Sequence, residues 1–385
     1  MKKVAILGIR GIPANHGGFE TFAEKLALYL VSREWQVTVY CQDDGGGSAI
    51  HESWWKKIHL IHLPSRLPGA LGTIEFDLKS ALHAAKEGTL ILTLGYNTAA
   101  FCSLYRLKGI PNLINMDGLE WKRDKWNSVE RTWLYINERL GCWLGNHLIA
   151  DHPEIKQHLT SRISSEKITM IPYGAEHVQQ ASENLLEPYG LHPGAYALII
   201  ARPEPENSIL EIVKAFSAKR RGISLAVLGK YDPSNSYHRK VIEAASDEVS
   251  FIGAIYEEPI VQALRSHSRL YIHGHRVGGT NPSLVEALGA GSAVLAHDNA
   301  FNRWVAGPEN QYFNDVADCE RKLDIILDDP IILNQMKAGS MQRYHEEFRW
   351  SRVLEQYERL LEAWLPNTMP PIEAPTPMPD IAQAR

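Results

Sequence analysis

Two glycine-containing segments of the sequence have the residue types that bind anions. The first, residues 8–20 (GIRGIPANHGGFE), follows a short apolar run and leads into a helical pattern, with Gly17 and Gly18 at its start. Glycines let the backbone come close to a ligand, and free N–H groups at a helix N-terminus attract negative charge. The segment lacks the G-x-G-x-x-G pattern of dinucleotide-binding loops, which disfavours a dehydrogenase. A glycine loop that serves only chain geometry is the alternative.

The second segment, residues 273–289 (HGHRVGGTNPSLVEALG), combines glycines, a helix start and a carboxylate. Asn281 suits the N-cap and Pro282 the first helical position. The N–H groups around this start are suited to a pyrophosphate and belong to Gly278, Gly279, Thr280, Asn281 and Ser283. Glu286, one turn further, can accept hydrogen bonds from a ribose hydroxyl, and a solvated helix residue is the alternative.

Charged residues also follow two expected strands. Arg202, in residues 201–207 (ARPEPEN), ends the first strand of the second half, where open α/β sheets bind ligands. A guanidinium binds phosphate through two parallel hydrogen bonds, so Arg202 is a candidate for phosphate binding. A surface salt bridge to Glu204 or Glu206 is the alternative.

Residues 115–123 (NMDGLEWKR) place Asp117 and Glu120 after a strand of the first half, where catalytic groups belong in such folds. Tryptophans alternate with basic residues from position 121 to 133 and again at residues 54–57 (WWKK). Such clusters stack on sugars or lie at a lipid headgroup surface. Core tryptophans with solvated lysines between them are the alternative.

Strand and helix patterns alternate along the chain and position these residues. Apolar runs predict strands at residues 4–7, 37–41, 58–63, 90–94, 113–116, 147–150, 196–200, 225–229, 249–252, 270–273 and 293–296. Helical spacing is found at residues 19–30, 210–216 and 352–365. Strands that alternate with helices predict right-handed crossovers and mostly parallel sheets, so we expect an α/β fold. The 385 residues suit two domains.

The composition of the chain argues against several classes of protein. A net charge of -5 argues against a nucleic-acid partner, and the apolar runs are too short for a membrane span. The four cysteines lie far apart, so neither a zinc site nor a disulfide framework is expected. We therefore expect a cytoplasmic enzyme. Residues 366–385 are rich in proline and are expected to be disordered.

Taken together, these motifs resemble the glycosyltransferases of the GT-B fold and, among them, the retaining family four, over residues 1–365. Residues 171–174 (IPYG) look like the sequence that closes the first domain in that family. Arg202 matches the arginine that binds the donor diphosphate, and Glu286 matches the second glutamate of the family's paired-glutamate motif, which holds the nucleotide ribose. Trp350 and the last helix look like the segment that crosses back to the first domain.

A narrower resemblance concerns residues 8–20, 117–126 and 274–283, which look like the subgroup of bacterial rhamnosyltransferases of polysaccharide assembly. The sequence departs from the larger family at three positions. Gly278 stands where the first glutamate of the pair would fall, Asn207 replaces a diphosphate-binding lysine, and Asp117 replaces an acceptor-side histidine. Because the missing glutamate contacts the donor sugar, the resemblance implies a donor other than a common hexose, such as a 6-deoxyhexose.

The resemblance also implies the domain organisation. Two Rossmann-like domains would face each other across a cleft, with residues 1–175 binding the acceptor and residues 190–345 binding the nucleotide-sugar. Residues 346–365 would form the helix that crosses back, and residues 366–385 the disordered tail.

The implied activity is sugar transfer with retention from a nucleotide diphosphate-sugar to a saccharide or lipid-linked saccharide, without a metal or other cofactor. Arg202, Asp117 and Glu286 would form the catalytic group, with the donor also held by Gly17, Gly18, Asn207 and the segment 278–283. The lipid-linked acceptor would place the protein at the inner face of the cell membrane, with peripheral membrane contact. The alternatives are a UDP-hexose donor, a sugar-nucleotide epimerase of the same fold and a non-catalytic sugar-binding partner of an assembly complex.

Overall fold

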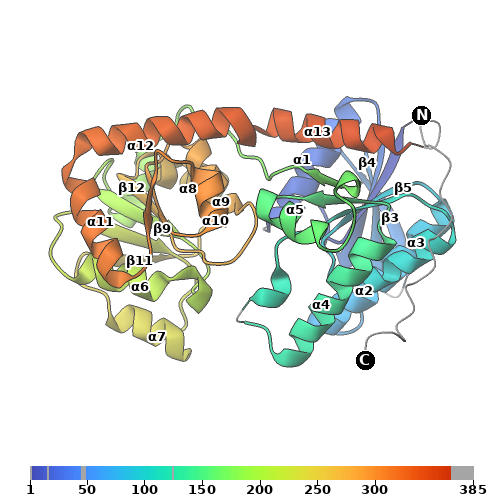
Figure 1. The fold of residues 1–385 in the computed structure, drawn as a ribbon, viewed down its shortest axis with the longest axis horizontal. Helices are drawn as coiled ribbons and strands as arrows, with labels where there is room; N and C mark the ends of the chain where they lie inside the picture. Colours follow the sequence, from blue (N-terminus) through green and yellow to red (C-terminus); the bar gives the residue numbers. More distant parts are fainter. Residues whose placement is uncertain (1, 15–16, 45–48, 124, 366–385) are drawn as a thin grey trace.

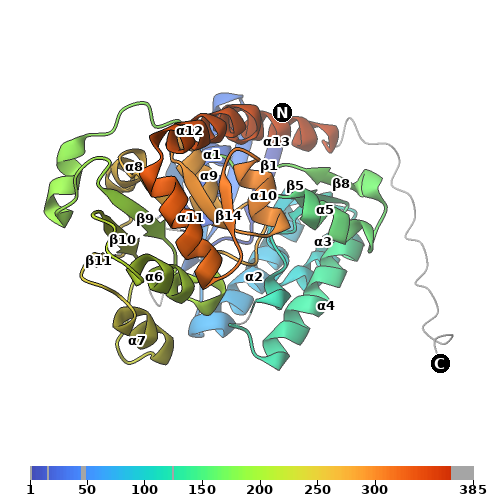
Figure 2. The same ribbon diagram turned by 60° about the vertical axis from the view of Figure 1, so that its left-hand side comes forward.

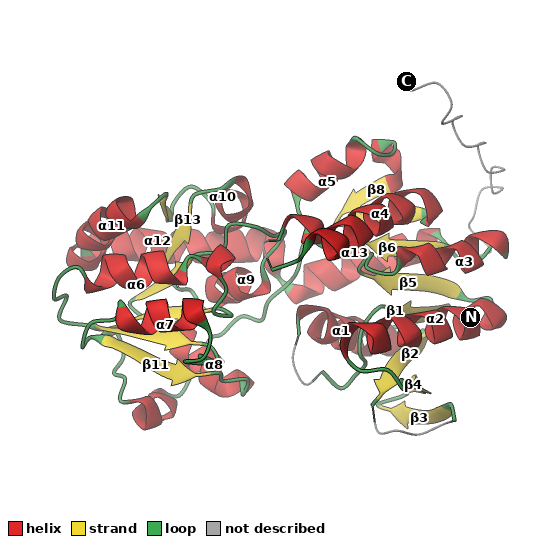
Figure 3. Cartoon of the chain, turned by 90° about the horizontal axis from the view of Figure 1, so that it is seen from below, coloured by secondary structure: helices red, strands yellow, loops and turns green. Residues whose placement is uncertain are grey.

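The structure is a computed structural model that describes residues 2–14, 17–44, 49–123 and 125–365. The proline-rich segment expected to be disordered, residues 366–385, lies outside these ranges. Two separate sheets, each flanked by helices, form two Rossmann-like bodies, which confirms the predicted α/β class (Figure 3). No helix in the described part of the chain has the length and apolar character needed to span a bilayer.

The first body contains an eight-stranded sheet. Its strands, in spatial order, are β3 (His51–Trp55), β4 (Ile58–Pro64), β2 (Gln36–Asp43), β1 (Lys3–Leu7), β5 (Leu90–Leu94), β6 (Asn112–Asn115), β7 (His147–Ala150) and β8 (Ile168–Met170). Its helices are α1 (Gly18–Ser32), α2 (Gly69–Glu87), α3 (Ser103–Leu107), α4 (Ser128–Leu144) and α5 (Pro153–Thr160).

The second body contains a six-stranded parallel sheet. Its strands, in spatial order, are β11 (Val249–Gly253), β10 (Ser224–Leu228), β9 (Tyr196–Ile200), β12 (Leu270–His273), β13 (Val294–His297) and β14 (Gln311–Phe313). Its helices are α6 (Ile209–Ser217), α7 (Ser236–Glu243), α8 (Glu258–Ser266), α9 (Pro282–Gly289), α10 (Ala300–Ala306), α11 (Val316–Asp328) and α12 (Pro330–Arg343).

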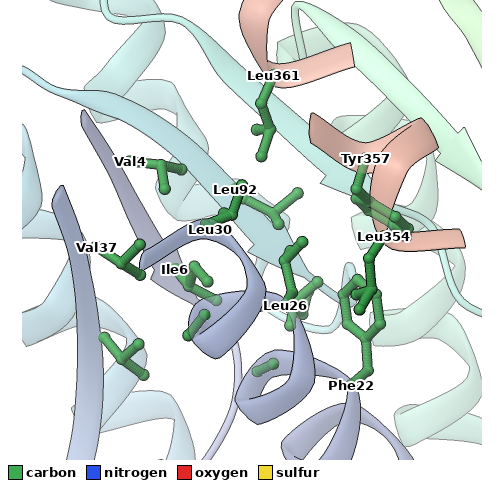
Figure 4. Close-up of a cluster of buried hydrophobic side chains, with 14 of the residues drawn as sticks. Val4, Ile6, Phe22, Leu26, Leu30, Val37, Leu92, Leu354, Tyr357 and Leu361 are labelled. Carbon is green, nitrogen blue, oxygen red and sulfur yellow. The ribbon is translucent and has the colours of Figure 1, made fainter. Parts of the chain in front are cut away.

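The last helix, α13 (Trp350–Ala363), leaves the second body and packs on the first, as Figure 1 shows along one edge of the molecule. Its apolar face, Leu354, Tyr357 and Leu361, is buried against α1 and the first sheet (Figure 4). The rings of Phe22 in α1 and Tyr357 lie 4.6 Å apart between centroids. Both apolar faces were visible as helical spacing in the sequence, so the core of this contact confirms that prediction.

The sheet of the first body is mostly parallel, as predicted, with one antiparallel pair at its edge. Strands β3 and β4 form an antiparallel hairpin whose two turn residues, Lys56 and Lys57, have φ of 46° and 68°. Such turns usually contain Asn-Gly or Asp-Gly. Because two lysines occupy this turn instead, the sequence did not predict the hairpin. Trp54, which the sequence placed in a basic-aromatic cluster, is exposed on this hairpin and stacks on His59 at 4.8 Å.

Candidate functional site

The loop before α9 in the second body approaches three strand-end loops of the first body. A Cβ atom added at Gly18 would lie 3.2 Å from the Pro282 ring, and one added at Gly118 would lie 3.2 Å from the Gly278 carbonyl carbon. The Thr280 N–H donates a 2.8 Å hydrogen bond to Oδ2 of Asp151, which follows β7. The two glycine-containing segments of the sequence therefore meet because glycines leave room for the two backbones.

Asp117 lies at this meeting point and is held by the end of β6. Its φ of 51° is left-handed, and its N–H donates to Oδ1 of Asn115 at 2.9 Å. Asn115 in turn donates to the Tyr357 hydroxyl at 2.8 Å, so the crossing helix fixes this turn. Burial, together with the nearby carboxylates of Glu120 and Asp151, raises the pKa of Asp117 to about 7. The carboxyl group can therefore exchange a proton near neutral pH.

Arg202 lies two residues after Ile200, the last residue of β9, and is exposed at the same edge. Its guanidinium forms no ion pair with any other described residue, whereas Glu206, one of its expected surface partners, lies 3.6 Å from Nε of Arg123. The predicted ligand Asn207 is buried, and its amide donates to the Arg202 carbonyl at 2.9 Å. Asn207 therefore acts on the loop that carries Arg202.

Two cations of the first body join Arg202. Arg123 Nε lies 3.1 Å from Glu120 Oε1, and Lys125 Nζ lies 3.9 Å from Glu120 Oε2. Burial lowers the pKa of Lys125, and the nearby positive charges of Arg123 and Arg202 lower it too. The sequence placed Arg123 and Lys125 in a cluster for sugars or lipid headgroups, but the structure places them between the two bodies.

The N-terminus of α9 has the predicted cap. Asn281 Oδ1 accepts the Ser283 N–H at 3.0 Å, and Pro282 occupies the first turn. Glu286 is partly exposed, and its Oε2 lies 2.6 Å from Nη2 of the buried Arg265. The Ser283 N–H is therefore already used by the cap, and Arg265 fixes the direction of the Glu286 carboxylate.

His273 and His275 lie beneath this loop with their rings stacked at 4.3 Å. Burial lowers the pKa of His275 to about 3, and the positive charges of Arg123 and Arg202 act in the same direction. Burial also lowers the pKa of His273 well below its ordinary value, so both rings are neutral at physiological pH. Among the residues that the structure describes, no three His, Cys, Asp or Glu side chains are grouped to hold a metal ion.

A cavity of about 570 Å³ lies between the bodies, and Leu119, two residues after Asp117, is part of its lining. Its polar lining includes Lys122, Glu154, His158 and Arg276, and its apolar lining includes Leu119 and Val277. His158 Nε2 lies 3.0 Å from a carboxylate oxygen of the buried Glu138, which also accepts from Trp121 Nε1 at 2.6 Å.

Trp121 and the cavity-lining His158 are thus held by the same buried carboxylate. Sequence reasoning missed Asp151, although its position directly after a predicted strand at residues 147–150 was a usable signal. It also missed the role of Tyr357, because its partner Asn115 lies 242 residues earlier in the chain.

Comparisons with known proteins agree with this architecture. Residues 1–176 match the family model described as "Domain of unknown function (DUF1972)", and residues 209–359 match the model "Glycosyl transferase-like". No curated protein matches the chain in sequence.

Solved structures match nearly the whole chain. The sucrose-phosphate synthase from Thermosynechococcus elongatus is 17% identical with a TM-score of 0.78, and the match covers 94% of this chain and 98% of that one. HepE from Anabaena in complex with UDP is 13% identical with a TM-score of 0.74, at 94% and 100% coverage.

A UDP-forming trehalose-phosphate synthase from Burkholderia xenovorans, bound to glucose-6-phosphate, is 13% identical with a TM-score of 0.71, at 94% and 100% coverage. At these identities the matches establish the fold. The chain therefore has the GT-B glycosyltransferase fold, and its residues 209–359 match the glycosyl transferase-like family.

Proposed function

We propose that this protein is a retaining glycosyltransferase that moves a 6-deoxyhexose such as rhamnose from a nucleotide diphosphate donor to a saccharide acceptor in bacterial surface polysaccharide synthesis. The observation that carries the proposal is that Asp117, the α9 N-terminus and Arg202 lie where the two Rossmann-like bodies meet. Gly118 approaches Gly278, and the Ser283 hydroxyl donates at 3.3 Å to the carbonyl of Ile200, two residues before Arg202. Each group stands at or just beyond the carboxyl end of a strand, where open α/β sheets bind ligands.

The donor diphosphate would lie between Arg202 and the loop before α9. In the structure this loop already binds an anionic group, because the Thr280 N–H donates to the carboxylate of Asp151. Arg202, Arg123 and Lys125 add positive charge, and Lys125 stands near Arg202 where the family lysine is missing at Asn207. Hydrogen bonds aimed at the departing diphosphate stabilise the charge that develops as the sugar leaves.

The donor sugar would lie near Gly278, and the acceptor in the cavity that Leu119 and Lys122 line. A Cβ atom added at Gly278 meets no atom within 4 Å, so space that a glutamate side chain would fill stays open to the sugar. The polar lining of the cavity supplies donors and acceptors for saccharide hydroxyls. Asp117 would orient the attacking hydroxyl, while a donor phosphate oxygen takes its proton on the same face of the sugar.

The test is product analysis with a panel of nucleotide-sugars. We expect dTDP- or GDP-linked 6-deoxyhexoses to raise the melting temperature and to be transferred with retention, because a ligand that binds the native state stabilises it. Transfer of a UDP-hexose alone would support the alternative donor. Conversion of the donor without any acceptor would identify an epimerase, and absence of both transfer and slow donor hydrolysis would support a non-catalytic sugar-binding role.

Replacing Glu286 should weaken donor binding. In Glu286→Ala the ribose hydroxyl loses its acceptor, which costs about 1–3 kcal/mol of binding free energy. Glu286→Gln should lose less, since its amide oxygen still accepts and can still face Arg265. Calorimetry with the nucleoside diphosphate measures both variants. The melting temperature serves as the control, because the alanine variant also leaves the buried Arg265 without its carboxylate. Unchanged affinity in Glu286→Ala would remove Glu286 from the donor site.

Replacing Lys125 tests whether the first body contributes to the diphosphate site. We expect Lys125→Gln to lower kcat/KM by about tenfold, since a hydrogen bond to a charged group contributes about 1.5–3 kcal/mol. Donor hydrolysis without acceptor should fall equally, because the acceptor is not involved. Lys57→Gln, in the exposed hairpin turn, is the matched control and should change neither rate. Equal activity of the two variants would contradict the assignment of Lys125.

A further inference from the structure

Helix α4 carries an apolar stripe on its outer face in addition to the apolar face that packs on the sheet. Val129, Ile136 and Trp143 are spaced seven residues apart and are 78%, 48% and 52% exposed. Seven residues are close to two helical turns, so the three side chains point in one direction. Trp133 lies on the same stripe, and its Nε1 donates to the Asn97 carbonyl at 2.8 Å, which fixes its half-exposed ring.

Helices α2 and α3 continue this apolar surface. Leu71, Leu78 and Leu82 follow the outer side of α2 and are 61%, 39% and 46% exposed, and Leu107 at the end of α3 is 84% exposed. Helix α2 contacts α3, and both α2 and α4 contact the short helical turn Ala99–Cys102. Figures 1 and 2 show α2, α3 and α4 together on the same side of the first body. Single exposed leucines are ordinary, but a shared face of this width marks an interaction surface.

The charges around this face are mostly positive, although the whole chain has a net charge of -5. The described basic residues exposed on and beside these three helices are Arg66, Lys86, Lys108, Arg131 and Arg139. The exposed acidic residues there are Glu87 and Glu130, while Glu138 is buried, Asp77 is partly buried and accepts from the Thr98 hydroxyl, and Glu75 is paired with Lys79. The face therefore complements an anionic surface, and its tryptophans suit the headgroup layer of a bilayer.

We propose that the outer face of α2, α3 and α4 docks on an anionic lipid bilayer. Leucines, valine and isoleucine would enter the boundary between headgroups and acyl chains, and the basic residues would contact the phosphates. Lys122, shortly before α4, lines the cavity, so a saccharide on a membrane lipid could reach it from this side. Only this last step rests on the proposed glycosyltransferase function; the docking itself does not.

This face differs from the two clusters that the sequence suggested, of which the exposed hairpin of residues 54–57 stays a prediction. Trp121 is bonded to buried Glu138, and Lys125 lies in the ion-pair cluster between the bodies, so neither is suited to reach a bilayer. An apolar face of this kind could instead bind a second copy of the chain. The excess of one charge sign disfavours it, because two identical faces would bring like charges together.

The test is co-sedimentation of the full chain with phosphatidylcholine vesicles, with and without phosphatidylglycerol. We expect the wild type to bind the anionic vesicles, and to bind less to neutral vesicles or at high salt. The variant L71Q/L107Q/V129Q/W143Q should lose about tenfold in bound fraction, since it removes apolar area that enters the bilayer. The matched control is I242Q/Y256Q/I325Q/I331Q, four comparably exposed side chains of the second body, which should bind like the wild type.

The proposal would be overturned if the wild type did not bind anionic vesicles at low salt, or if the control variant lost as much of its bound fraction as the first variant. It would also be overturned if sedimentation velocity showed a wild-type dimer that the first variant converts to monomer. Melting temperatures and donor hydrolysis without acceptor should be unchanged in both variants, which shows that they fold. Vesicle binding is measured without substrates. A protein that binds vesicles but transfers no sugar would therefore contradict the proposed function and still support the docking proposal.

Discussion

Arg202→Ala is expected to lower the rate of sugar transfer by about 30- to 1000-fold while the melting temperature stays within about a degree of wild type. The guanidinium stands near the end of β9 and makes no ion pair with the other described residues, so its removal breaks no ion pair in that part of the chain. It would instead remove a charge-assisted hydrogen bond that strengthens as the diphosphate leaves, at a cost of about 2–4 kcal/mol in transition-state stabilisation.

The measurement is kcat and KM for the donor, with hydrolysis by water as a second readout that needs no acceptor. Arg202→Lys should recover part of kcat, because a single ammonium keeps the charge without the two parallel hydrogen bonds. Arg239→Ala is the matched control and should remain active, because Arg239 is another arginine of the same body and its guanidinium donates to the carbonyls of Pro233 and Ser234. Activity of Arg202→Ala within threefold of wild type would rule out its assignment to the diphosphate.

Asp117→Asn is expected to lower kcat by about 100-fold or more, the range of positioned acid–base and hydrogen-bonding groups. The wild-type rate should rise with pH through about 7, because burial raises the pKa of Asp117 to about 7 and the carboxylate that accepts from the acceptor hydroxyl forms above it. The asparagine variant should lack this rise. The measurement is the pH profile of kcat for the wild type and for Asp117→Asn. Loss of the rise near pH 7 in the variant would indicate a role in the reaction, because a merely structural role would lower the rate without changing the profile.

Asp117→Asn should lower kcat, but it should not lower the stability of the folded protein near pH 8. The pKa of Asp117 is higher in the folded protein than the ordinary 3.8 expected when unfolded, so the folded state binds this proton more tightly. Folding stability is then lost as the pH rises from about 4 to about 7, and the full cost of the buried charge remains above 7. Asp117→Asn removes that charge, so its melting temperature near pH 8 should equal or exceed that of wild type. A marked drop would mean that Asp117 is needed for the fold.

The α/β architecture could be predicted from the sequence because its signal is local. Buried parallel strands are short apolar runs, and the helices between them show apolar spacing that needs no knowledge of the partner surface. The apolar faces of α1 and α13 and the N-cap at Asn281 could be predicted from such local patterns. The hairpin of β3 and β4 did not, since lysines occupy a turn that is usually marked by asparagine and glycine. The three-residue strands β8 and β14 are too short to show a pattern.

The sequence by itself also determined which residue types stand at the strand ends, and so the candidate residues Asp117, Arg202 and Glu286. Only the tertiary structure decided what those side chains meet. It brought Lys125 toward Arg202, placed Asp151 on the Thr280 N–H and gave Glu286 its partner Arg265. It also showed that Asn207 is buried, and that the exposed tryptophans on α4 belong to a wider apolar face. The reason is physical: a strand end fixes where a residue lies along one element, whereas its pKa, partners and exposure depend on side chains that distant parts of the chain bring to it.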